Sequence, residues 1–312
     1  MNIIAELDYK LQRSKEFQNI LDLRHFDSSY RICIRNYNEL LNILKYGHSP
    51  DLAAEILPLN KRDEMQYYME EVSRIFMNFL SSSFAFMEFS RRTYRKYENN
   101  KNYFPDYQEK INLFFSNNAN VQFIHKLRNY IVHYNFPKIT FKMIWDGEKG
   151  LQTSIELSKA ELLKYKEWNT ISKQILLNPP EEIIIINEIE RYQNNQFNFH
   201  NWFKEQLVYL HKEDFNYVKA MQRKIDYEFS LILLEQIVYG IAEFEKEKKG
   251  KPEDIFNNLL LHQIEIGEIF EYNQTIQVRV DLAIQYMNSL GNKLPLEIEE
   301  KIRNVFKTYY SY

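Results

Sequence analysis

The chain has 312 residues, of which 45% are hydrophobic, so it can bury a globular core and hold one large domain or two to three smaller ones. Its net charge of −3 argues against a protein whose main role is to coat nucleic acid. The single cysteine, Cys33, excludes an intramolecular disulfide framework, and no apolar run approaches membrane-spanning length. Because the first residues also lack a signal-peptide pattern, we expect a cytoplasmic protein without a membrane partner.

Aromatic residues are abundant and turn-forming residues are scarce. The 23 Tyr and 22 Phe against 7 Gly and 8 Pro favour long helices over a turn-rich β fold, so the expected fold class is mainly α. Apolar side chains recur at helical spacing over residues 3–46, as one or two helices that Gly47 and Pro50 end. A second helix, over residues 63–97, is apolar on nearly every side of its middle, which predicts a central, buried helix.

Two further helices are expected before the first strand. One lies near residues 106–117, and the asparagine-rich segment 117–120 gives a start signal for the next. Pro137 lacks an N–H and disfavours helical angles in the residue before it, so this helix should end near residues 134–136.

Alternation of apolar and polar side chains predicts a β-hairpin over residues 138–157, a small attachment on a helical protein. Residues 158–177 return to helix, with Ser158 and Glu161 as a capping box.

The segment 178–180, Asn-Pro-Pro, is the best candidate for a domain boundary. Beyond it, helices are expected over residues 181–210, 212–248 and from residue 254 to the end of the chain. The four isoleucines 183–186 have the composition of a strand, but their acidic flanks and the following apolar spacing favour helix. The expected parts are therefore an N-terminal helical segment (1–60), a central domain that includes the hairpin (61–177) and a C-terminal helical region (181–312).

The helix before Pro137 carries Arg128, Asn129 and His133 in the pattern Arg-Asn-x-x-x-His. His125, Asn129 and His133 repeat every fourth residue and share a polar face, opposite a stripe of apolar residues. Arg128 lies off this face, but its long side chain can bring the guanidinium round to it. His133 falls in the last turn, where the helix dipole favours the imidazolium.

These side chains suit the attack of a ribose 2′-OH on the adjacent phosphodiester. Imidazole can accept or give the proton, a guanidinium offers a fork of donors to phosphate oxygens, and Asn129 can orient either partner. The chain has no CxxC pair, glycine-rich phosphate loop or HExxH pattern, so no metal or cofactor is expected. Arg35 and Asn36 repeat the Arg-Asn pair without a histidine at the required distance, and are expected to be ordinary surface residues.

The motif, with four residues between Arg128 and His133 and a polar residue directly after the arginine, resembles the signature of the HEPN superfamily. These are helical domains that are often metal-independent ribonucleases. The resemblance implies a HEPN-like helical bundle over residues 61–177. It also implies an endoribonuclease whose substrate is RNA, acting as a toxin or antiviral-defence effector, with an antitoxin protein as a possible further partner. Two such motifs usually meet across a dimer interface in that family, which implies a homodimer with a site shared by both protomers.

Two candidate substrate contacts are open to a second interpretation. Arg91, Arg92 and Arg95 cluster in the most basic part of the chain, where residues 61–137 hold 11 basic and 8 acidic residues, and can contact RNA phosphates. A solvated helix end whose cations complement the helix dipole explains the same cluster equally well. His125 either extends the polar face or is a hydrogen-bonded or solvated histidine. The alternative for the whole protein is a catalytically inactive helical module that binds RNA or protein.

Overall fold

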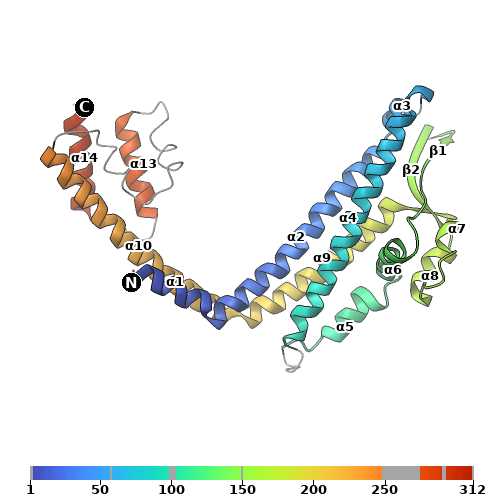
Figure 1. Cartoon of the computed structure of the whole chain (residues 1–312), viewed down its shortest axis with the longest axis horizontal. Coiled ribbons are helices and arrows are strands. Elements are labelled where there is room, and N and C mark those ends of the chain that lie inside the picture. Colours follow the sequence, from blue (N-terminus) through green and yellow to red (C-terminus); the bar gives the residue numbers. More distant parts are fainter. Residues whose placement is uncertain are drawn as a thin grey trace. The chain divides into compact units, whose positions relative to one another are not determined.

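The computed structural model describes residues 3–56, 58–97, 103–148, 150–247, 275–289 and 293–310. The chain divides into two compact units (Figure 1). The central unit is Ile20–Lys212, and the terminal unit is Met1–Asn19 with Glu213–Tyr312. These limits differ from the predicted boundaries at residues 60 and 180, because helices from both sides of those positions pack into one core.

The central unit is built on the long helices α2 (Lys15–Gly47), α4 (Arg62–Arg95) and α9 (Ile185–Leu210), which run side by side in Figure 1. Rings from all three meet in the core: Phe26 of α2 lies 5.6 Å from Phe86 of α4 and 5.1 Å from Phe203 of α9, between ring centroids. The mainly helical fold class is therefore confirmed.

Helix α4 was predicted to be a central, buried helix, and the structure buries one side of it. Phe76, Phe79 and Phe86 are fully buried, whereas Met77 is 40% exposed and Ser81 is also exposed. The apolar side chains in the middle of α4 therefore lie mostly on its buried side, and the side with Met77 and Ser81 is exposed.

A polar network crosses the core of the central unit and joins its three long helices to α6 (Ala119–His133). The Cys33 thiol donates to Oε1 of Gln196 at 3.1 Å and lies 3.4 Å from the hydroxyl of Ser83. Gln196 Nε2 donates to the Tyr192 hydroxyl at 2.9 Å, and that hydroxyl is 3.0 Å from Nε2 of His125. Burial without such partners would be costly, so these bonds fix how the helices pack.

Helix α6 begins and ends where the sequence predicts. Short helix α5 (Tyr107–Ile111) continues into a π-helical turn (Asn112–Ser116), and the Asn118 side chain then caps α6 by accepting from the Val121 N–H at 3.2 Å. The helix ends at His133, ahead of Pro137.

The predicted hairpin is confirmed as β1 (Ile139–Asp146) and β2 (Gly150–Ser158), paired antiparallel from Ile139↔Leu157 to Asp146↔Gly150. A third strand, β3 (Glu182–Ile184), pairs antiparallel with the other side of β2, and the order is β1-β2-β3. Helix at residues 183 and 184 was therefore a wrong prediction. The free edge of β2 supplies ladder partners that outweigh helix propensity in this short segment.

Gly47 brings the sheet onto the helices. A Cβ at this position would overlap the hydroxyl of Tyr68 on α4 and the side chain of Ile155 on β2. A larger residue at the end of α2 would require the Tyr68 and Ile155 side chains to move. The short helix α3 (Pro50–Ile56) and a 3₁₀ turn (Leu59–Lys61) then lead into α4.

Residues 158–177 form two short helices, α7 (Lys159–Leu162) and α8 (Thr170–Leu177), instead of one. The predicted capping box does not form: Ser158 is at the N-cap position of α7, but its side chain makes no cap hydrogen bond, and the Glu161 carboxylate accepts from Lys164 instead. The Trp168 indole donates to the Leu162 carbonyl at 2.7 Å and closes α7, and Asn169 caps α8.

The terminal unit contains α1 (Ile3–Arg13), α10 (Lys212–Glu247), α13 (Ile276–Ser289) and α14 (Leu296–Tyr310). A small apolar cluster joins α10, α13 and α14 around Ile237, Val280 and Ile302. The helix expected from residue 254 lies partly outside the described residues. No helix in the described ranges is both long and apolar enough to cross a membrane.

Candidate functional site

Helix α6 holds the predicted catalytic residues in its second half. Arg128 and His133 are five residues apart, so their Cα–Cβ directions differ by roughly 140° around the helix axis. Asn129 lies between them, one turn before His133. Asn129 is half-buried, and His133 is exposed.

Arg128 is held against α4 by the ring of Phe84. Its guanidinium carbon lies 4.5 Å from the centroid of that ring, a cation–π contact. Nη1 of Arg128 lies 3.4 Å from Oδ1 of the adjacent Asn129. Its Nε is buried, and no acceptor for this N–H lies among the residues that the structure describes.

His133 ends the polar face in contact with solvent. In the described part of the chain, its imidazole takes part in no hydrogen bond, ion pair or ring contact. His133 is therefore able to exchange a proton with a bound molecule.

His125, two turns earlier, has a different environment. It packs against the rings of Phe84, Phe115 and Tyr192 and bonds to the Tyr192 hydroxyl. Burial, with a smaller effect of the Arg91 charge, lowers the pKa of His125 to about 4. The structure places it as a neutral, hydrogen-bonded histidine at neutral pH, the second of the two interpretations above.

The three arginines near the end of α4 lie on one side of the helix. Around the helix axis Arg95 is about 40° from Arg91, and Arg92 is about 100° from Arg91 and covers the ring of Phe89 at 4.4 Å. Arg91 also forms an ion pair with Glu88 at 2.6 Å, and all three arginines are exposed. The Arg91 charge also contributes to the lowered pKa of His125.

The tyrosines beside these arginines are engaged within the protein. Tyr94 stacks on Tyr107 with ring centroids 3.4 Å apart, and Tyr97 bonds to His211 at 2.7 Å. Each of these side chains therefore has a partner within the protein. A groove of about 580 Å³ lies beyond the end of α6, and its lining residues include Met77, Phe136 and Pro137.

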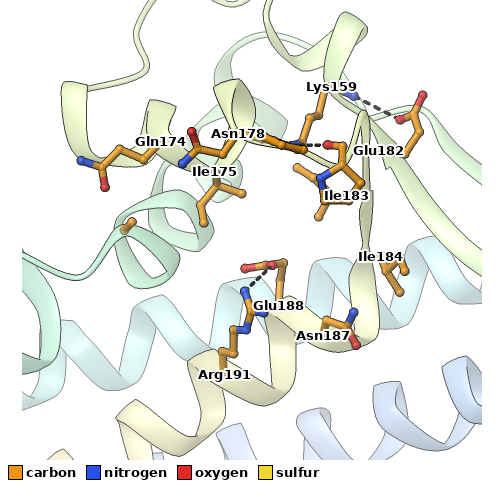
Figure 2. Close-up of a pocket in the computed structure, with 13 residues that line it drawn as sticks. Lys159, Gln174, Ile175, Asn178, Glu182, Ile183, Ile184, Asn187, Glu188 and Arg191 are labelled. Atoms are coloured by element: carbon orange, nitrogen blue, oxygen red, sulfur yellow. Dashed lines mark hydrogen bonds and ion pairs between the residues drawn. The ribbon is translucent and has the colours of Figure 1, made fainter.

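A separate pocket of about 320 Å³ lies between α8, β3 and the start of α9. Figure 2 shows Glu188 and Arg191 on one side of it and Lys159 on the other. The Lys159 ammonium donates to the carbonyl oxygens of Asn178 at 2.5 Å and Pro180 at 2.6 Å. Glu188 accepts from Arg191 at 3.2 Å. The charged groups of Lys159, Glu188 and Arg191 thus already have hydrogen-bond partners within the protein, and these bonds stabilise the walls of the pocket.

Sequence patterns missed the partners of the motif residues. Phe84, which carries Arg128, and Tyr192, which holds His125, stand 44 and 67 residues from them in the sequence. The spacing of residues within one helix does not predict a contact with a residue so distant in the sequence. The polar residues within the apolar stripe of α9, such as Gln196, were a usable signal, because a polar side chain on a buried face needs a partner.

Among the residues that the structure describes, no three His, Cys, Asp or Glu side chains are grouped so that they could hold a metal ion. The chain was compared with models of known protein families, with curated proteins and with solved structures, and none of the three comparisons gave a match.

Proposed function

We propose that the protein is a metal-independent endoribonuclease of HEPN type that cleaves RNA by attack of a ribose 2′-OH. The state of the two motif side chains carries this proposal. His133 is exposed and has no partner in the described ranges, and Arg128 is fixed on Phe84 with its Nη1 at the polar face. Phosphodiester cleavage requires positive charge at a fixed position and a histidine that can transfer protons.

In the proposed reaction, one imidazole accepts the proton of the 2′-OH while that oxygen forms a bond to phosphorus. The bond from phosphorus to the 5′ oxygen breaks, and the leaving oxygen takes a proton from an imidazolium. The products are a 2′,3′-cyclic phosphate and a 5′-OH. Arg128 stabilises the negative charge on phosphorus, and Asn129 keeps its guanidinium on the polar face.

The resemblance to HEPN ribonucleases implies that two copies of the motif meet in one site, so that one His133 accepts a proton while the other donates one. We therefore propose a homodimer in which each protomer supplies Arg128 and His133 to one site. Arg91 and Arg95 would extend the basic surface along the RNA backbone. A toxin or antiviral role, with an antitoxin protein as partner, belongs to the same proposal.

The first test is His133→Ala with RNA as substrate. Loss of a positioned acid–base group should reduce the cleavage rate by about 100- to 10,000-fold. The matched control is His25→Ala, since His25 is also an exposed helical histidine, on α2. Cleavage should survive EDTA, and chromatography of the products should show the cyclic phosphate. Wild-type cleavage by His133→Ala, or its abolition by EDTA in the wild type, would refute the mechanism.

The second test separates the charge of Arg128 from its packing. Arg128→Met keeps an apolar stem on Phe84 but removes the guanidinium, so cleavage should fall by about 100-fold or more while thermal stability changes little. Arg35→Ala is the control, because Arg35 is exposed on α2. If wild-type protein binds RNA without cutting it, and both Arg128→Met and His133→Ala bind equally well, the inactive binding module takes the place of the enzyme.

A further inference from the structure

Strand β1 is an exposed sheet edge with unusual composition. Within the described residues it pairs with β2 alone, so its other side faces away from the sheet. Three consecutive apolar side chains are exposed on it: Met143 at 43%, Ile144 at 51% and Trp145 at 75%. Successive side chains of a strand alternate between faces, so apolar surface is exposed on both sides of this edge. Such an edge is a template for another strand.

We propose that β1 pairs antiparallel with β1 of a second copy of this chain, across a two-fold axis at Ile144. The two three-stranded sheets would then form one continuous sheet. This interface lies on the hairpin, goes beyond the proposed ribonuclease activity and does not depend on it.

Strand geometry restricts the register of such a pair. The outward N–H and C=O groups of β1 belong to every second residue, and in an antiparallel pair these residues must face one another. The axis must therefore pass through a residue and not between two. This leaves a small number of registers over the eight residues of β1.

Charge selects among these registers. With the axis at Ile144, Lys142 of each chain faces Asp146 of the other, and Met143 faces Trp145. An axis at Lys142 would oppose two lysines, and an axis at Met143 would place Lys142 against Ile144. Opposite charges and apolar pairs stabilise cross-strand contacts, and like charges destabilise them. Only the Ile144 register matches every pair from 142 to 146.

Lys142 can bond to Asp146 of the second copy and keep its ion pair with Glu156 in its own sheet. Its ammonium lies 3.4 Å from the buried carboxylate of Glu156 on β2, yet its side chain is 45% exposed. An ammonium has three donors, so it can bond on both sides. The segment is complementary to itself, which favours a second copy over an unrelated peptide.

The test is a disulfide at the axis. In Ile144→Cys, the two Cα atoms would lie about 4.5–5.5 Å apart, within the range that a disulfide spans. Diamide, which takes up two electrons and two protons as two thiols join, should convert most of the protein to a covalent dimer. Thr140→Cys on the same strand is the control, since the two copies would be about 27 Å apart. The native Cys33 is fully buried and should not contribute.

A second variant tests the register. Adding Asp146→Lys to Ile144→Cys opposes two pairs of lysines and should reduce the yield of dimer by about tenfold. Adding Glu148→Lys makes the same charge change outside the paired segment and should leave the yield unchanged. Circular dichroism checks that each variant folds. Equal cross-linking at positions 140 and 144, no cross-linking at 144, or no effect of Asp146→Lys would each overturn the proposal.

Discussion

At the scale of single residues, two histidines of α6 show how position sets chemistry. His125 and His133 are eight residues apart on one helix, yet the first is bonded to Tyr192 in the interior and the second is exposed. A neutral interior histidine holds helices together. An exposed histidine at a helix end can carry a proton to or from a ligand.

The low pKa of His125 makes folding stability depend on pH. Burial lowers this pKa from 6.5 to about 4, so between these values the unfolded chain binds a proton that the folded chain does not. Stability should therefore fall as pH falls through this window, by about 2 kcal/mol between pH 7 and pH 5 from this group. His125→Gln cannot titrate, so its urea denaturation curves should change less over the same range. Equal pH dependence in both proteins would contradict this account.

The sequence was sufficient to place the motif but not to assign each role. Spacing put His125, Asn129 and His133 near one another on α6, and Asn118 and Pro137 correctly limited the helix. Whether His125 faces water depends on Phe84 and Tyr192, which come from other helices. Contacts of that kind arise only when the chain is packed, so local spacing left both interpretations open.

At the scale of elements, β3 shows a tertiary contact overriding local preference. Residues Ile183–Ile186 can be helix or strand by composition, and the structure divides them: Ile184 ends β3, and Ile185 begins α9. Long helices such as α2 and α4 were predictable, because their apolar residues recur at helical spacing over many turns. Short elements next to a sheet edge were not.

The turn between α8 and β3 should depend on Lys159. Its ammonium binds two carbonyl oxygens of this turn, and the residue is 6% exposed. Lys159→Met should lower the free energy of unfolding by about 1–3 kcal/mol, because hydrogen bonds from a charged donor are lost. Lys164→Met is the control: the Lys164 side chain is 60% exposed, and its ion pair with Glu161 should contribute little. Equal urea midpoints for the two variants would show that the bonds of Lys159 do not stabilise the turn.

At the scale of the whole molecule, every candidate site residue belongs to the central unit. That unit has its own aromatic core, and the terminal unit has a separate apolar cluster. The expected boundary at residues 178–180 followed from its two prolines, but proline marks a local turn and not the limit of a core. Which helices share a core is decided by contacts between distant residues.

A fragment of residues 20–212 should fold without the rest of the chain. Each unit with its own core is expected to unfold cooperatively. The fragment should give a helical circular dichroism spectrum and one thermal transition, and it should retain any ribonuclease activity of the full chain. A fragment with a helical spectrum but no cooperative transition would show that the terminal unit completes the core.

The buried position of Cys33 provides an internal sensor of how often the helical core opens. Its side chain contacts α4 and α9, and burial raises the pKa of its thiol to about 11, so the reactive thiolate is scarce while the core is closed. An aromatic disulfide reagent should label it only during excursions that separate these helices, and the labelling rate then measures their frequency. A ligand that binds the closed core should slow this rate in proportion to its occupancy. One native atom thus allows binding to be detected before any substrate is identified.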